Sequence, residues 1–118
     1  AHPESMLRQV AEKNGAVDGR TAFQAAEMGD EIALSVCRDY AGYLAAGLTD
    51  LVNILHPEAV ALGGGVAAAP EQLLLEPVRK IVARECYARH VDKVPHILRA
   101  ELGNDAGIIG AAMLGRAI

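Results

Sequence analysis

A long amphipathic segment places the strongest constraint on how this 118-residue sequence can fold. Between Asp30 and His56, large apolar residues recur three or four positions apart, which puts them on one stripe of a helix: Ile32, Val36, Tyr40, Leu44, Leu48, Leu51 and Leu55. At about 1.5 Å per residue, this helix is about 40 Å long. Asp30 is expected to cap its start, and Pro57 to terminate it. Small residues between Ala41 and Gly47 make its middle thin, which predicts close packing on a sheet or a partner helix.

Two strands are predicted after this helix. The short apolar run Ala59–Leu62 shows no alternation, which is typical of a strand buried on both faces. Val94–Leu102 is predicted as a second strand. Between them, a helix is expected from Pro70 to about Arg89, with a break near Leu75 or Glu76 because Pro77 falls inside its pattern.

Three further helices complete the pattern. The spacing predicts helices over Ser5–Asn14 and from Thr21 to about Met28, the latter with a capping box formed by Thr21 and Gln24. The last helix, Ala106–Ala117, is apolar on nearly every face and is expected to be buried. The order of helices, strand, helix, strand and helix indicates an α/β fold. Two strands make a narrow sheet, so we expect residues 1–118 to form a single domain that belongs to a larger α/β protein or an obligate oligomer.

Composition excludes several classes of function. The net charge is -4, whereas proteins that bind duplex nucleic acid usually carry a clustered excess of Lys and Arg. Aromatic residues, on which single-stranded bases stack, are only 3% of the chain. Cys37 and Cys86 are expected to be buried free thiols, with a single disulfide between them as the alternative. The sequence contains no membrane span and begins without the basic and apolar regions of a secretion signal, so a cytoplasmic protein is expected.

The best candidate site is the turn Gly63-Gly64-Gly65-Val66, which directly follows the first strand. Glycines at such a place allow positive φ and leave no side chain between the backbone and a ligand. Ligands of open α/β sheets lie beyond the carboxyl ends of strands. The turn does not match the dinucleotide fingerprint, because Ala68 occupies the third glycine position, and it is not a P-loop. A flexible strand-to-helix turn is the alternative interpretation.

Other polar motifs have simpler interpretations. Asn104-Asp105-Ala106-Gly107 is expected to be a helix cap with Asp105 as its acceptor, and Asp18-Gly19-Arg20-Thr21 a tight turn. The basic run that includes Arg79, Arg84 and Arg89 is interpreted as an exposed helix face. The four histidines have no ligand spacing, so neither catalytic nor metal-binding residues are predicted here.

Two blocks of this sequence resemble the ROK family of repressors, open reading frames and kinases. The first block is Asp50-Leu51-Val52-Asn53-Ile54-Leu55-His56-Pro57-Glu58-Ala59-Val60-Ala61-Leu62-Gly63-Gly64-Gly65-Val66, and the second runs from Val94 to Ala112. The resemblance covers nearly the whole chain from Thr21 onward. It implies part of the C-terminal lobe of an actin-like, ribonuclease H-like ATPase fold, with long helices packed on a small sheet.

The resemblance also carries functional expectations. It implies a glucokinase-like enzyme that transfers a phosphoryl group from ATP with Mg²⁺ to a hexose, with Gly63, Gly64, Gly65 and Val66 facing the nucleotide. It further implies a homodimer. The family's phosphate loop, catalytic Asp and zinc motif have no match in these residues, so the zinc ligands are expected outside this chain, and the chain alone is expected to be inactive. A sugar-responsive ROK repressor and a stand-alone dimerisation module are the alternatives.

Overall fold

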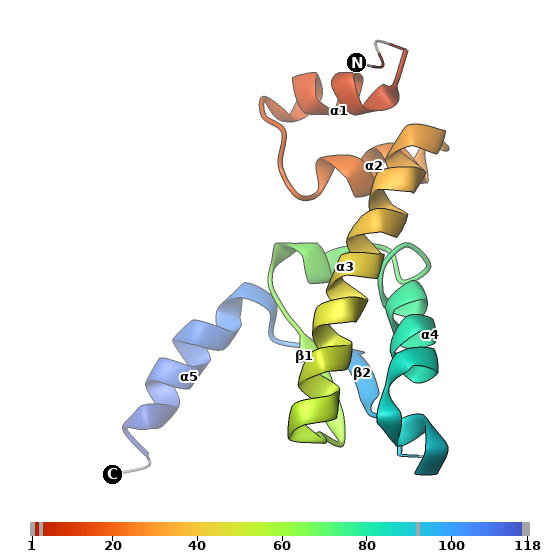
Figure 1. Cartoon of the computed structure of the whole chain (residues 1–118). Coiled ribbons are helices and arrows are strands. Elements are labelled where there is room, and N and C mark those ends of the chain that lie inside the picture. The colour runs from red at the N-terminus through yellow and green to blue at the C-terminus, as the bar shows by residue number, and fades with distance from the viewer. Residues whose placement is uncertain (1, 3, 92, 117–118) are drawn as a thin grey trace.

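The computed structural model describes residues 2, 4–91 and 93–116 (Figure 1). The regular elements are, in chain order, α1 (Met6–Asn14), α2 (Thr21–Glu27), α3 (Glu31–Leu55), β1 (Ala59–Leu62), α4 (Leu75–Glu85), β2 (His96–Arg99) and α5 (Ala106–Leu114). Short 3₁₀ turns lie between them: η1 (Gly65–Ala68), η2 (Tyr87–Val91) and η3 (Gly103–Asp105). None of the helices in these ranges has the length and apolar content needed to cross a membrane.

Helix α3 is the central element, and its ends lie where the sequence predicts. The Asp30 side chain accepts a hydrogen bond from the Ala33 N–H at 2.8 Å, and His56 closes the helix in the left-handed conformation before Pro57. Its buried face consists mainly of small residues spaced four apart: Ala33, Cys37, Ala41, Ala45, Leu48, Thr49 and Val52. Of the predicted stripe of large residues, only Leu48 is buried, while Leu51 and Leu55 are exposed. The small residues face inward because they allow α2 and α4, which make the most extensive contacts with α3, to approach its backbone closely.

Helix α4 packs along α3 and contacts β2 (Figure 1). It begins at Leu75, and Pro77 lies in its first turn, where the missing N–H of a proline costs no internal hydrogen bond. The predicted helix start at Pro70 is therefore wrong, because residues 71–74 form turns before the helix begins. The helix ends at Glu85 instead of continuing to Arg89, because Cys86 adopts an extended conformation. Asn53 of α3 is hydrogen-bonded to η2, the turn after α4, since its Oδ1 accepts from the Tyr87 N–H at 2.9 Å.

The sheet consists of β1 and β2, which run parallel with Val60 opposite Ile97 and Leu62 opposite Arg99. Ile97 is buried, and Val60 and Leu62 pack against the same core as α3 and α4. Ala59 and Ala61 are exposed on the other face, so the prediction that β1 is buried on both faces is wrong. Helices cover only one side of this two-stranded sheet. The second strand also spans only four residues of the predicted Val94–Leu102.

Two further predictions are corrected. Helix α5 has no buried residue in its described range, and Ile108 is 74% exposed, because α5 leads away from the sheet and packs mainly against η3 (Figure 1). Its predicted last residue, Ala117, lies outside the described residues. The Asp105 side chain makes no capping hydrogen bond. The radius of gyration, 17.0 Å, exceeds the roughly 13.5 Å typical of a closed domain of this length.

The start of α2 is capped by an aspartate instead of the predicted capping box. Asp18 Oδ1 accepts from the N–H groups of Arg20 and Thr21 at 2.9 and 3.1 Å, and Thr21 Oγ1 accepts from the Asp18 N–H at 3.0 Å. Gln24 turns to Asn14 instead, whose Nδ2 donates to its Oε1 at 2.8 Å. Asp18, three residues before the helix, therefore accepts from the Thr21 N–H, which the Gln24 side chain was expected to satisfy.

One carboxylate joins the starts of α1 and α3. Besides capping α3, Asp30 accepts through Oδ2 from the Ser5 hydroxyl at 2.9 Å and from the Met6 N–H. These hydrogen bonds, the one from Ala33 N–H above all, hold the pKa of the Asp30 carboxyl below its ordinary value. The ionised form of Asp30 therefore stabilises the attachment of α1 to the rest of the chain.

Enlarging the small-residue face of α3 is expected to destabilise the fold. Ala45 is completely buried, so Ala45→Leu should lower the free energy of unfolding by about 1–3 kcal/mol through overpacking. Ala46 is exposed, and Ala46→Leu should change it by less than about 0.5 kcal/mol. Urea unfolding followed by circular dichroism measures both, and equal effects of the two variants would contradict the packing described for α3.

The hydrogen bonds accepted by Asp30 predict that the free energy of unfolding depends on pH in a specific way. A carboxyl whose pKa is lower in the folded chain than in the unfolded chain stabilises the fold above the unfolded value, and this stabilisation is lost as the pH falls through the folded value. The difference in unfolding free energy between the wild type and Asp30→Asn should thus be largest near neutral pH and shrink below the ordinary pKa of 3.8. Denaturation at a series of pH values tests this, with the exposed Asp50→Asn as control. A difference that does not change with pH would disprove the assigned role.

Candidate functional site around the glycine turn

The glycine turn lies at the edge of the sheet where both strands end. Because β1 and β2 are parallel, their carboxyl ends share this edge. Leu62 O accepts from the Ala100 N–H at 2.8 Å, which extends the pairing one step beyond the strands. Gly63 follows at once, and the chain then turns into η1. The predicted site residues 63–66 therefore occupy the position at which open α/β sheets bind ligands.

The three glycines differ in why the fold accepts them. Gly64 has a φ of 85° and a ψ of 179°, a conformation that is essentially restricted to glycine. Gly63 and Gly65 do not have positive φ. A Cβ at Gly63 would meet only Ala100 Cβ at an ordinary 3.6 Å, and at Gly65 it would meet no atom of the described residues within 4 Å. Of these three positions, the fold therefore requires glycine only at position 64. At positions 63 and 65, the described residues leave room for a Cβ, so the fold does not explain why glycine occurs there.

Hydrogen bonds hold the segment after the glycines in place. The Ala67 N–H donates to Gly64 O at 3.2 Å, and the Ala69 N–H donates to Val66 O at 3.0 Å. Arg99, at the end of β2, donates from Nη2 to Ala69 O at 2.6 Å. In α4, Arg79 donates through Nε to Ile97 O at 2.8 Å, so this arginine supports β2 and is not part of a freely solvated helix face, as was predicted for it. Nothing in the sequence pattern indicated either of these arginine contacts.

The structure brings together two turns that are far apart in the sequence. A Cβ on Gly19 would lie 3.1 Å from Val66 Cγ2, so the turn Asp18–Thr21 rests directly on the first residues of η1. The sequence analysis interpreted Asp18–Thr21 only as a turn, which it is. Its position against Val66 depends on the packing of α2 on α3, and no local signal could have predicted it.

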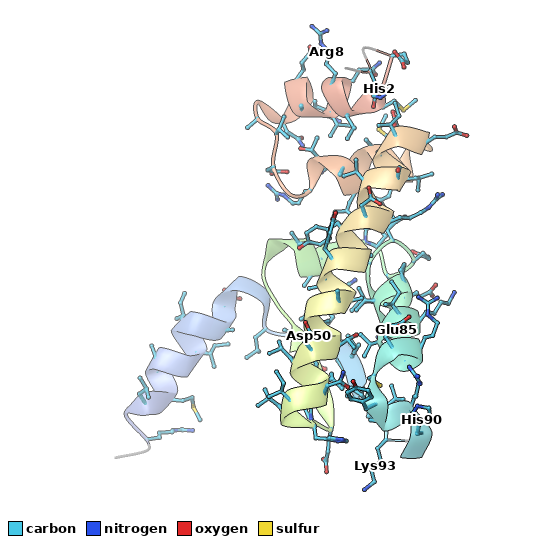
Figure 2. The ribbon with its side chains drawn as sticks, in the orientation of Figure 1. His2, Arg8, Asp50, Glu85, His90 and Lys93 are labelled. Carbon is cyan, nitrogen blue, oxygen red and sulfur yellow. The ribbon has the colours of Figure 1, made fainter. Side chains whose placement is uncertain are left out.

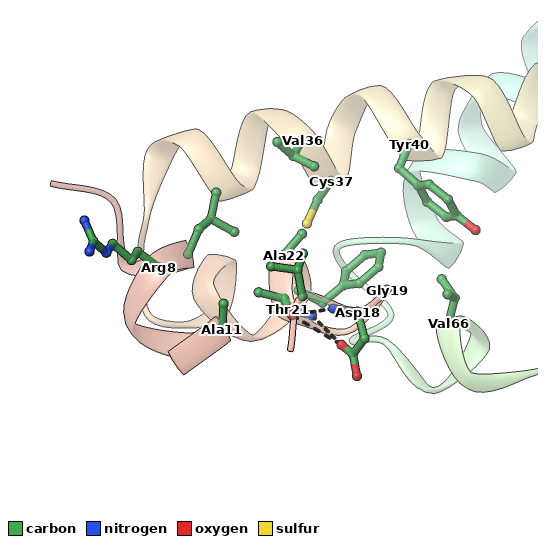
Figure 3. A pocket seen from close by; sticks show the side chains of 13 residues that line it. Arg8, Ala11, Asp18, Gly19, Thr21, Ala22, Val36, Cys37, Tyr40 and Val66 are labelled. Atoms are coloured by element: carbon green, nitrogen blue, oxygen red, sulfur yellow. Dashed lines mark hydrogen bonds between the residues drawn. The ribbon is translucent and has the colours of Figure 1, made fainter. Parts of the chain in front are cut away.

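A cavity of about 540 Å³ opens on one side of Val66, between α1, α2 and α3 (Figure 3). Its walls are mostly apolar and include Ala11, Ala22, Val36 and Tyr40. Hydrogen bonds from Arg20 lower the pKa of the Asp18 carboxyl at its rim, and burial raises the pKa of the Cys37 thiol in its wall. Cys37 and Cys86 are both free and buried, as predicted. This cavity suits an apolar group, because its one carboxylate is already paired with Arg20.

A smaller cavity of about 160 Å³ also has Val66 in its wall. One side is formed by the segment that continues the glycine turn, from Gly65 to Pro70. The other side is a face of α2 that carries polar and charged groups around Phe23. Its lining residues on this side are Phe23, Gln24 and Glu27 of α2, and Arg20 directly before the helix. Unlike the larger cavity, this one combines an apolar wall with hydrogen-bonding groups.

The remaining sequence candidates do not join this site. Among residues 2, 4–91 and 93–116, no three His, Cys, Asp or Glu side chains come close enough together to hold a metal ion. His2 and His90 lie at opposite ends of the molecule (Figure 2). His56 and His96 line a common hollow, at the opposite end of the strands from the glycine turn. Asp105 follows β2 beyond the edge that carries the glycine turn, and the side chain of Asn104 lies outside the described set.

An α/β lobe with bare glycine backbone at the carboxyl ends of parallel strands is a form typical of nucleotide-binding proteins. The model of the ROK family matches residues 3–118, and this chain belongs to that family. A glucokinase of Halalkalibacterium halodurans is 37% identical over 113 residues, which are 96% of this chain and 34% of the relative. The chain therefore spans about a third of the length of such relatives.

Solved structures agree with this assignment. A ROK family glucokinase from Streptomyces griseus in complex with glucose and AMPPNP has a TM-score of 0.79 and 33% identity, and the match covers 98% of this chain and 36% of that one. A ROK hexokinase from Thermus thermophilus has a TM-score of 0.68 and 34% identity, over 92% of this chain and 36% of that one. The predicted family and fold class, part of the actin-like ATPase fold of sugar kinases, are confirmed.

The different demands on the glycines can be tested by adding a single methyl group. Gly64→Ala should lower the free energy of unfolding by about 1–3 kcal/mol, because alanine is strained at this backbone conformation. Gly65→Ala should leave stability within about 0.5 kcal/mol of the wild type, because its methyl group enters open space. Thermal and urea unfolding measure both values. A Gly65→Ala variant as unstable as Gly64→Ala would show that the fold itself requires glycine at both positions.

Proposed function

We propose that this chain is the nucleotide-side and dimer-forming part, as one domain over residues 1–118, of an ATP-dependent hexose kinase of the ROK family. The observation that carries the proposal is the bare backbone of the turn at the shared end of β1 and β2. The Streptomyces griseus glucokinase, which matches over 98% of this chain, was solved with glucose and the ATP analogue AMPPNP. The related proteins cited above are named as sugar kinases, which favours a kinase over a repressor.

In this proposal, Gly63, Gly64, Gly65 and Val66 form a wall against the nucleotide. The open space at the Cβ position of Gly65 fits a ligand that approaches the backbone closely. Arg99 and the hydrogen bonds of η1 keep this wall rigid. A side chain at Gly65 would occupy the space that the proposal gives to the nucleotide.

The remaining chemistry is assigned to the rest of the protein. Phosphoryl transfer requires a base, an acceptor hydroxyl and metal-held phosphates arranged in line in one cleft. We propose that this chain contributes one wall of that cleft, and that it has no kinase activity by itself. The Mg²⁺ held with ATP and the family's zinc would be bound by residues outside this chain.

The apolar surfaces of the chain support the dimer-forming role. Tyr43, Ile54 and Leu55 of α3 are 81%, 76% and 69% exposed, and the apolar helix α5 contributes Ile108 and Leu114. Exposed apolar side chains in this number are typical of contacts with another chain or another part of the same protein. The extended shape of the chain is consistent with such partners.

Binding of Mg-ADP to the isotope-labelled chain tests the proposal. At millimolar Mg-ADP, amide shifts should concentrate at Gly63–Val66, and Gly65→Ala should weaken them because its methyl group obstructs the approach to the backbone. Gly42→Ala, at an open position on α3, is the matched control and should bind as the wild type does. A well-dispersed spectrum without shifts at the glycine turn would disprove the nucleotide role and favour a purely structural or dimerising one.

A further inference from the structure

Two consecutive residues at the end of β2 hold the glycine turn on the sheet. Before the turn, the Ala100 N–H donates to Leu62 O at 2.8 Å. After the turn, Arg99 donates from Nη2 to Ala69 O at 2.6 Å. In the described part of the chain, no other hydrogen bond joins residues 63–69 to the rest of the fold. The hydrogen bonding that attaches both ends of the turn to the sheet therefore comes from one short segment.

The carbonyl group of Ala69 depends on Arg99 for its hydrogen bond. Ala69 is only 7% exposed, and its N–H is already used within η1, where it donates to Val66 O. Among residues 2, 4–91 and 93–116, Arg99 is the one donor to Ala69 O. A buried carbonyl that loses its donor costs free energy, and hydrogen bonds from a charged donor are among the strong ones. Without the guanidinium, the segment after the glycines would move until this carbonyl reached water.

The register of the sheet explains why Arg99 can reach Ala69. Arg99 lies opposite Leu62 in the parallel pair, so the two side chains leave the sheet on the same face. Leu62 packs on the core beneath α3 and α4. Arg99 is the last residue of β2, and its long side chain extends from that face past the end of the strands to the segment after η1. A shorter side chain at this position would not span the same distance.

We propose that Arg99 is a positioning residue for the nucleotide, which sets the place of the glycine turn through its hydrogen bond to Ala69 and does not itself contact the ligand. This inference rests on the proposed function, because it concerns the same wall of residues 63–66. Gly64 has a backbone conformation that few other residues adopt, and nothing but glycine backbone precedes Val66 in the turn. A turn of this kind offers its amide groups to a ligand in a fixed direction only if both of its ends are held.

A direct contact with the nucleotide phosphates is the competing role for Arg99. Its side chain is exposed, and a guanidinium has more N–H groups than the one that donates to Ala69 O. The two roles differ in which ligands they affect. A direct phosphate contact strengthens the binding of ADP only, whereas a correctly placed turn strengthens the binding of adenosine and ADP alike. The observed hydrogen bond, which ends on the backbone of the wall itself, favours the positioning role.

Titration of the isotope-labelled chain with adenosine and with Mg-ADP tests the assignment. The variants are Arg99→Met, which removes every donor, and Arg99→Lys, which keeps a charged donor on a long side chain. Arg84→Met, at an exposed arginine of α4, is the matched control for the loss of one positive charge. All affinities are measured at a temperature at which urea unfolding shows each variant to be folded.

We expect Arg99→Met to weaken the binding of both ligands by the same factor, about five- to tenfold, as the loss of one hydrogen bond would do. Arg99→Lys should restore both affinities to within about threefold of the wild type, and Arg84→Met should bind as the wild type does. The ¹³C shift of the Ala69 carbonyl should also change in ligand-free Arg99→Met, together with the amide shifts of residues 63–68, while the signals of α3 stay in place. A merely structural loss would spread over the whole spectrum. If Arg99→Met does not fold, Arg99→Gln, with its shorter side chain, replaces it.

Four results would overturn the inference. An unchanged Ala69 carbonyl shift in Arg99→Met would show that this hydrogen bond does not hold the turn. Unchanged affinities in Arg99→Met, with shifts of the wild type still at Gly63–Val66, would leave the proposed function standing and remove Arg99 from it. Weaker binding of ADP alone, or an Arg99→Lys variant as weak as Arg99→Met, would replace positioning by a direct contact of the guanidinium. The absence of shifts with either ligand in the wild type would overturn the proposed function itself, and the inference with it.

Discussion

The close packing on the small-residue face of α3 is the interaction on which the rest of this structure depends. Ala33, Ala41 and Ala45 are completely buried, and they allow α2 and α4 to approach the same helix. Through α4, this packing positions β2, and Arg79 extends the support by donating to the backbone of Ile97. Through α2, it positions the turn that rests on Val66. Both sides of the candidate site are therefore held by one helix, although they come from distant parts of the chain.

Two aspartates complete this arrangement by satisfying backbone amides at helix starts. Asp18 caps α2, and Asp30 caps α3 while it also binds the start of α1. Such caps are local, but in this chain they also determine tertiary contacts, because the helices that they fix enclose the larger cavity. Part of the polar character around the site, the Asp18 and Asp30 carboxylates, is thus used to hold the helices in place.

The glycine turn lies at the shared carboxyl end of β1 and β2, where open α/β sheets bind ligands. It spans about a third of the length of its relatives, and several of its apolar surfaces are exposed, among them α5 and the outer face of α3. This combination fits a chain whose apolar surfaces contact another chain or another part of the same protein. It also explains why α5, expected to be buried from its composition, has no buried residue here: burial requires a second surface, and none of the described elements provides one.

The sequence by itself determined the family and most element boundaries, because these depend on residues that are close together in the chain. The Asp30 cap, the stop at Pro57, the helix start beside Pro77 and the glycines after β1 all act within a few residues. The nucleotide role of residues 63–66 was also predicted from sequence, and it stays a prediction. Only the tertiary structure decided which face of α3 is buried, the parallel pairing of β1 with β2, and the meeting of Gly19 with Val66. Each of these depends on surfaces brought together from distant parts of the chain, and no local pattern encodes them.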